Sequence, residues 1–242
     1  MSPSPQKQLT NPRPFDPSWK SLWRIGGITA LISILTAPAE VVIAFLPGVQ
    51  DALRHTVTVT DWFTLFQNHW FLGLRSFGLL NLTAAILFIP SILAIYSVLK
   101  RDCEAYAALA AIVFFLGIAV YIADNRAFPM LLLSRQYVSA AAGAQRCLLA
   151  AAGQAMLAEG QSRSGLLVIE FAFLLVSAVM LRSTAFSKAT ACAGMLAGVL
   201  MMILEIAFIP PHGVGMAIAA AGGLAMMTWS LLVGLRLLQL GR

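Results

Sequence analysis

The sequence predicts an all-α membrane protein with six transmembrane helices and a long outer helical segment between the third and fourth of them. Two features of the composition carry this prediction: 60% of the 242 residues are hydrophobic, and only 11% are charged. Soluble domains are about 45–50% apolar and about 25% charged, so this chain has too few charges to cover a soluble globule. The long apolar runs also exclude a coiled coil, a collagen-like chain and a disordered protein.

Six apolar runs are long enough to cross a bilayer. A helix needs about 20 apolar residues to span a hydrocarbon core of roughly 30 Å. In chain order the runs cover about Leu22–Leu46, Phe71–Leu99, Ala105–Ala123, Gly165–Leu181, Ala189–Ile209 and Val214–Leu238, and each ends near charged residues, Pro or Gly. We therefore expect a single transmembrane bundle over residues 21–242, preceded by a flexible, proline-rich cytoplasmic tail over residues 1–20.

The connections between these runs differ in length. Residues 100–104 and 183–187 form tight turns on one side, whereas residues 47–70 and 124–164 form long segments on the other side. In the first long segment, Asp61 is placed to cap a short helix whose aromatic residues lie in the membrane interface. The second segment contains an Ala-rich helix former that is too polar for a clear span. We interpret it as an outer helical lid or a re-entrant element, with a seventh span as the alternative.

Basic residues predict the orientation. An even number of spans puts both termini on one side, which carries all four lysines and six of the twelve arginines. That side has Lys7, Arg13, Lys20, Arg24, Lys100, Arg101, Arg182, Lys188, Arg236 and Arg242, and the other side has Arg54, Arg126, Arg135, Arg146 and Arg163. Cytoplasmic loops are enriched in Lys and Arg, so we expect both termini in the cytoplasm. This bias also accounts for the net charge of +6, and no nucleic-acid partner is predicted.

Ionisable residues inside or beside the predicted spans define the candidate site. The candidate ligand-binding residues are Glu40, Arg75, Asp124, Glu170, Glu205 and His212. Glu40, Arg75, Glu170 and Glu205 lie within spans, roughly 7–10 Å below the outer ends. Asp124 lies just above this level, and His212 lies on the outer side. Charged groups inside a bilayer are costly and usually face a partner or a water-filled cavity. We expect a polar pocket that opens outward and is closed inward.

Two prolines strengthen the prediction of a pocket at this level. Pro38 precedes Glu40 closely, and Pro210 lies a few residues beyond Glu205. Proline removes a backbone donor and interrupts a helix, and irregular backbone inside a membrane is tolerated where it lines a cavity. We therefore expect broken helices next to both acids.

Three interpretations of this polar layer are open. In the first, Arg75 pairs with one or two glutamates and locks the spans together. In the second, three buried acids against one buried arginine leave an excess carboxyl group that binds a cation, a proton or a small polar ligand. In the third, the three histidines and the carboxylates hold Zn²⁺ for an intramembrane hydrolase, although HExxH or a comparable ligand spacing does not occur.

The sequence thus favours a non-catalytic module that binds or transports a small ligand or ion, or an accessory subunit of a larger complex, and it predicts no cofactor. A metal-dependent hydrolase that uses His and Glu residues of the outer side is the alternative. The expected partner of the chain is the lipid bilayer. The GxxxG motif of Gly194 and Gly198 also predicts contact with other membrane subunits or with a second copy of the chain. Cys103, Cys147 and Cys192 lie at different depths in this topology, so we expect no disulfide.

Four short motifs carry a resemblance to a known family. They are Arg24-Ile25-Gly26-Gly27 at the start of the first span, Ala39-Glu40 at its outer end, the Gly194–Gly198 motif, and Trp229-Ser230-Leu231-Leu232-Val233-Gly234 near the end of the chain. In these motifs the chain resembles a bacterial family of six-span integral membrane proteins of unknown function. The resemblance implies the fold and the inner membrane of a bacterium, but no activity, and it gives added weight to Glu40.

Overall fold

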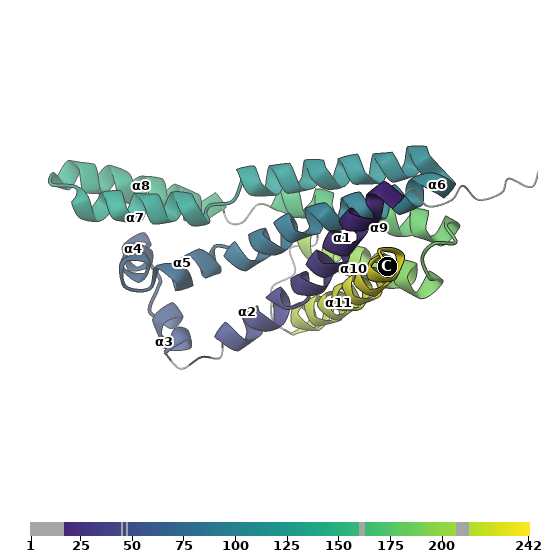
Figure 1. The fold of residues 1–242 in the computed structure, drawn as a ribbon. Coiled ribbons are helices and arrows are strands. Elements are labelled where there is room, and N and C mark those ends of the chain that lie inside the picture. Colours follow the sequence, from purple (N-terminus) through teal and green to yellow (C-terminus); the bar gives the residue numbers. More distant parts are fainter. Residues whose placement is uncertain (1–16, 45, 47, 160–162, 207–212) are drawn as a thin grey trace, which may run out of the picture.

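The computed structural model describes residues 17–44, 46, 48–159, 163–206 and 213–242, and every regular element in this part of the chain is a helix. A 3₁₀ turn, η1 (Pro17–Trp19), leads into α1. The α-helices are α1 (Lys20–Ser33), α2 (Thr36–Ala44), α3 (Val49–Arg54), α4 (Val59–Asn68), α5 (Trp70–Ser76), α6 (Leu79–Ala123), α7 (Ala127–Ser139), α8 (Gly143–Glu159), α9 (Arg163–Arg182), α10 (Lys188–Ile206) and α11 (Val214–Leu240) (Figure 1). The predicted all-α class is confirmed. Of the predicted tail, residues 1–16 lie outside the described residues.

Several helical segments have the length and apolar character of membrane spans. Among the described residues there are five: Lys20–Ile43, Leu79–Ser139, Gly143–Arg182, Lys188–Ile206 and Val214–Leu240. The chain therefore has the helices of a membrane protein. The sequence divides these residues into six apolar runs. The numbers differ because the second and third runs, which are separated in the sequence by charged residues from Lys100 on, belong to one continuous helical segment.

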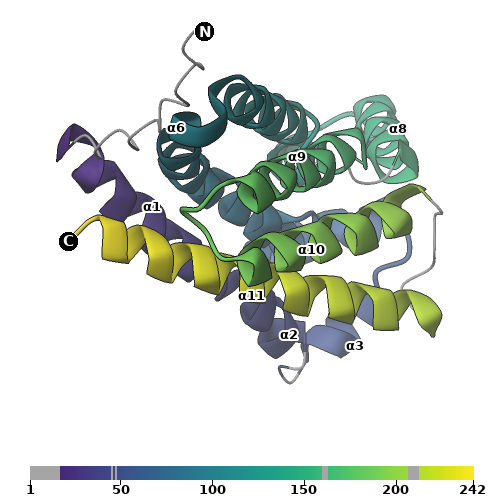
Figure 2. The same cartoon turned by 90° about the vertical axis from the view of Figure 1, so that its right-hand side faces the viewer.

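Helix α6 is a hairpin rather than a straight rod. Cys103 has φ −147° and ψ 65°, outside the helical region, so the direction of the chain changes there. The rings of Phe88 and Phe114 lie 6.3 Å apart, whereas a straight helix would separate these residues by about 39 Å. Figure 2 shows the two halves side by side. The tight turn predicted over 100–104 thus lies inside α6.

Five elements form a closed ring. Helix α1 contacts α6 and α11, α10 contacts α9 and α11, and α6 contacts α9 (Figure 2). Aromatic side chains fill the centre: the Phe173 ring lies 5.3 Å from that of Phe114 and 4.9 Å from that of Trp229, both nearly perpendicular. Edge-to-face contacts of this kind stabilise a core by about 0.5–1.5 kcal/mol each beyond their area burial. The ring is therefore held by a packed aromatic centre.

The first and last helices meet at one end of the bundle. Arg24 Nε donates a hydrogen bond of 2.7 Å to the carbonyl oxygen of Gly241. Further along the pair, a Cβ on Gly27 would lie 2.9 Å from the carbonyl oxygen of Gly234, so the two backbones touch. We call the end that contains Arg24 and Gly241 the terminal end and the opposite one the far end.

A smaller group of helices lies at the far end. Phe63 and Phe66 of α4 pack with Leu74 of α5 and with Met130 of α7. Helices α7 and α8 form a hairpin that projects beyond the ring (Figure 1). They occupy most of the stretch over 124–164, where the sequence predicts a helical lid or a re-entrant element. The backbone at Ala140 is extended, which divides this stretch into two helices.

Helix α4 begins with a capping box that involves Asp61. Its Oδ2 accepts a hydrogen bond of 2.7 Å from the backbone N–H of Thr58, and the Thr58 hydroxyl accepts one from the backbone N–H of Asp61. The hydrogen bonds from Thr58, together with one from Val57, lower the pKa of Asp61 below its ordinary value. The predicted capping role is confirmed, although Asp61 acts from the third position of the helix and Thr58 is the N-cap.

The GxxxG motif packs inside the chain. A Cβ on Gly194 would meet Ser177 of α9 and Trp229 of α11, and one on Gly198 would lie 3.0 Å from the carbonyl oxygen of Glu170. The close helix contact that this motif predicts is therefore made between α10 and its own neighbours. Self-association through the motif stays a prediction.

Candidate functional site

Arg75 and Glu40 form a short ion pair at the far end. Helix α1 ends at Ser33 and α2 begins at Thr36, so the predicted break next to Glu40 is confirmed, with Pro38 in the first turn of α2. Arg75 Nη2 lies 2.7 Å from Glu40 Oε2, and it also donates a hydrogen bond of 2.7 Å to the Glu40 carbonyl oxygen. The side chains are 10% and 27% exposed. The charge of Arg75 is therefore paired with that of Glu40.

Glu205 has a looser partner. Its Oε2 lies 3.9 Å from Nε of Arg163, the first residue of α9, and the Arg163 side chain is 48% exposed. Pairs this long and this open to solvent contribute between zero and about 1 kcal/mol. The sequence places Arg163 only in a connecting segment. The separation of Arg163 and Glu205 along the chain does not indicate that the two residues come into contact.

Glu170 is buried without such a partner. It lies seven residues after Arg163, about 10 Å along α9, and is 5% exposed. Its Oε2 has no hydrogen-bond partner among the described residues. Glu205, on the neighbouring helix, is close enough for its charge to act on Glu170. Among the described residues, the charged group that acts on Glu170 is therefore a second carboxylate.

Tyr121 is a buried residue close enough to two of the acids for their charges to act on it. This residue of α6 is 3% exposed, and the charges of Glu205 and Glu40 both act on its hydroxyl group. Helix α9 comes close to it because a Cβ on Gly165 would lie only 2.7 Å from the Tyr121 backbone. Glu40 of α2 and Glu205 of α10 thus both act on a side chain of α6, and Glu205 also acts on Glu170 of α9. The shared depth of the three acids in a bilayer stays a prediction.

Two predicted site residues remain, Asp124 and His212. Asp124 is exposed and follows the end of α6, where its Oδ2 accepts a hydrogen bond of 3.2 Å from the Ser164 hydroxyl. This contact ties the end of α6 to the start of α9. His212, like the predicted break at Pro210, lies outside the described residues.

The described histidines do not join the acids. His55 and His69 are exposed, one after α3 and the other between α4 and α5. Within residues 17–44, 46, 48–159, 163–206 and 213–242, no three His, Cys, Asp or Glu side chains are grouped so that they could hold a metal ion. The zinc interpretation therefore gains no support from the described part of the chain.

Two further polar side chains, which the sequence analysis did not single out, lie deeper in the ring of helices. Ser177 Oγ and Trp229 Nε1 are both buried and have no hydrogen-bond partner among the described residues. Both approach Gly194. Ser177 lies two turns beyond Glu170 on α9, so the polar face of this helix extends below the acids. Both residues sit in apolar runs, where nothing in the sequence distinguishes them from packing residues.

The fold and this group of acids define a helical membrane protein with an acidic cluster at one end of its bundle. No protein-family model, curated protein or solved structure matches the chain. The resemblance to a six-span family thus stays a prediction, and a functional interpretation rests on the geometry of the described residues.

Proposed function

We propose that this chain is a polytopic protein of the bacterial inner membrane that binds a proton or a small cation at Glu170. In this proposal it has six spans, because the two halves of α6 cross the bilayer separately, and α7 and α8 form the outer segment. Both termini are cytoplasmic, since the terminal end carries Lys20, Arg24, Lys100, Arg101, Arg182, Lys188, Arg236 and Arg242 against only Asp102 and Glu104 among the described residues.

The observation that supports a bound proton or cation is that Oε2 of the buried Glu170 has no hydrogen-bond partner among the described residues. A charged carboxylate is very costly to bury without a partner, so the group must hold a proton or a cation. Arg75 cannot supply the charge, because it pairs with Glu40 at 2.7 Å. Arg163 reaches Glu205 instead, and only at 3.9 Å. The excess of acid expected from the sequence therefore falls on Glu170.

A purely structural role explains the Arg75–Glu40 pair but not the position of Glu170. The Arg75–Glu40 contact joins α5 to α2 and fits the interpretation of a lock between helices. Glu170 makes no such contact through Oε2, and it lies beside a second acid rather than a base. An acid kept in this position is typical of a site that takes up and releases a positive charge.

Infrared spectroscopy of the purified protein in lipid nanodiscs tests the proposal. A protonated carboxyl group has a carbonyl band apart from that of the carboxylate. We expect one such band in the native protein to weaken as the pH rises, or as sodium chloride replaces choline chloride at constant pH. The band should be absent from Glu170→Gln at every pH.

Glu104→Gln is the matched control, because Glu104 is exposed at the opposite end of the bundle. This variant should keep the band and its response. Identical spectra for the native protein and Glu170→Gln would overturn the proposal. So would a Glu170 band that responds to neither pH nor sodium, because a permanently protonated acid is only a packing residue.

A further inference from the structure

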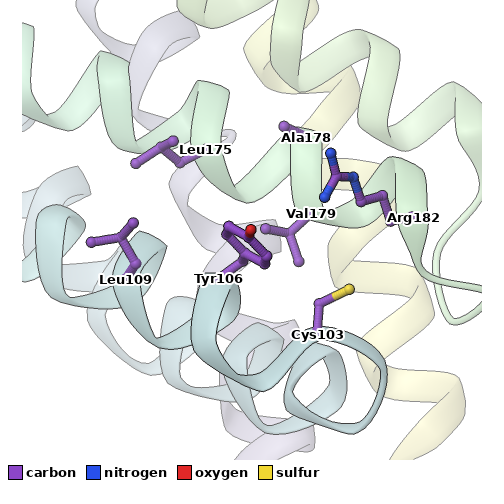
Figure 3. Close-up of a pocket in the computed structure, with 7 residues that line it drawn as sticks. All are labelled: Cys103, Tyr106, Leu109, Leu175, Ala178, Val179 and Arg182. Carbon is purple, nitrogen blue, oxygen red and sulfur yellow. The ribbon is translucent and has the colours of Figure 1, made fainter.

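A groove of about 130 Å³ lies between the second half of α6 and α9, close to the terminal end (Figure 3). Leu109, Leu175, Ala178 and Val179 line its apolar part. In Figure 3 the two leucines lie at one end of the groove, and Arg182 lies at the other end. The groove is therefore apolar along its length and carries a positive charge where α9 ends.

The groove opens toward the surroundings of the bundle rather than toward its core. Along the same half of α6, Tyr106 is 58% exposed, Leu109 is 50% exposed and Ile112 is 64% exposed. A continuous exposed apolar face of this kind marks an interaction surface, and in a membrane protein it faces lipid. The occupant of the groove must therefore reach it from the bilayer.

Arg182 is held in position but forms no ion pair with an acid of the described residues. Its guanidinium carbon lies 5.7 Å from the centre of the Tyr106 ring. The nearby Asp102 is occupied, since its Oδ2 accepts hydrogen bonds of 2.6 Å from the Ser183 hydroxyl and 3.3 Å from the backbone N–H of Thr184. Within the described part of the chain, Arg182 forms no ion pair with Asp102 or Glu104.

Two other basic residues at this end already have partners. Lys100 Nζ lies 4.2 Å from the centre of the Trp19 ring, and Arg236 Nε donates a hydrogen bond of 2.7 Å to the carbonyl oxygen of Ala185. Arg182 is the basic residue that lines the apolar groove. Its forked donors match a phosphate group, and basic sites at the cytoplasmic ends of spans attract anionic lipid headgroups.

We propose that this groove binds an anionic phospholipid of the surrounding bilayer. A segment of one acyl chain lies against Leu109, Leu175 and Ala178, and the phosphate lies against Arg182, within reach of the Tyr106 hydroxyl. The apolar wall excludes a free phosphate ion as the natural occupant, because such an ion gains nothing from these side chains. This site lies at the opposite end from Glu170 and is independent of the function proposed for that residue.

Cys103 provides a reporter of occupancy because it lines the groove beside Arg182 (Figure 3). All three cysteines are free, as expected, and the two exposed ones, Cys147 and Cys192, are replaced by serine. The experiment measures the rate at which N-ethylmaleimide alkylates Cys103 of the full chain in a neutral detergent. Dioleoyl phosphatidylglycerol should slow alkylation severalfold, dioleoyl phosphatidylcholine should slow it less, and glycerol 3-phosphate should have no effect.

Arg182→Gln should raise the phosphatidylglycerol concentration for half-protection about tenfold, the effect of losing one charge-assisted contact. Lys188→Gln removes an equal charge from the same end, outside the groove, and should change this concentration by less than about twofold. Ala178→Leu fills the groove without altering charge and should abolish protection. Equal effects of Arg182→Gln and Lys188→Gln, protection by glycerol 3-phosphate, or full protection of Ala178→Leu would each overturn the proposal.

Discussion

At the scale of single residues, the acids of the far end differ in what neutralises them. Glu40 has Arg75 at 2.7 Å, Glu205 has the more exposed Arg163 at 3.9 Å, and the Oε2 of Glu170 has no hydrogen-bond partner among the described residues. Their common depth in the membrane is a prediction from the sequence, because depth follows from position within an apolar run. Which acid pairs with which base was not readable, because pairing depends on how the helices rotate and pack.

The Arg75–Glu40 pair yields a prediction about stability. Arg75→Leu should destabilise the protein by about 3 kcal/mol, the lower end of the range for breaking a buried pair, because both side chains retain some exposure and Glu40 is left without its counter-ion. Urea titration or the thermal midpoint of the detergent-solubilised protein measures this loss.

The double variant Glu40→Gln/Arg75→Leu should recover much of that stability, since no charge is then left unpaired. Arg54→Leu is the control, because Arg54 is exposed in α3 and should change the midpoint little. If the double variant were as unstable as Arg75→Leu alone, the loss would come from packing rather than from charge.

At the scale of helices, most elements could be predicted and their continuity could not. Apolar runs of about 20 residues predict the long helices α9, α10 and α11 well. The continuity of α6 was not predicted, because the helix passes through Lys100, Arg101 and Asp102 and leaves the helical conformation only at Cys103, within the turn expected over residues 100–104. Charged residues end an apolar run, but Lys and Arg are also good helix formers, so a helix can continue where an apolar run ends.

Close packing of α10 depends on Gly194. Gly194→Ala should destabilise the bundle by about 1–3 kcal/mol, because a Cβ would collide with Ser177 and Trp229. The thermal midpoint and the fluorescence of the buried Trp229 would both report the change.

Gly223→Ala is the matched control in a neighbouring helix. A Cβ there meets nothing within 4 Å, and alanine is the better helix former, so this substitution should be neutral or slightly stabilising. Equal losses in both variants would mean that glycine is required at these positions for a reason other than space.

At the scale of the whole molecule, the two ends of the bundle differ in charge and in construction. Basic side chains collect at the terminal end, while acids and the α7–α8 hairpin lie at the far end. The proposed topology gives a prediction. In right-side-out spheroplasts a membrane-impermeant maleimide should label Cys147 of α8, and a cysteine introduced by Lys188→Cys should react only in inside-out vesicles.

Each of these cysteines is tested alone, with the other native cysteines replaced by serine. Labelling of both from the same side would contradict the proposed arrangement, and reversed labelling would contradict the orientation. Total reactivity after detergent solubilisation confirms that each thiol is accessible in the folded protein.

The closed ring of helices also determines when the contact between α1 and α11 can form. Helix α11 lies between α1 and α10, and its Gly234 touches Gly27 of the first helix. Because the ribosome makes α1 before the other ring helices and α11 after them, the Gly27 surface lacks this partner until the other ring helices have been made. The arrival of α11 between α1 and α10 is therefore the step that closes the ring.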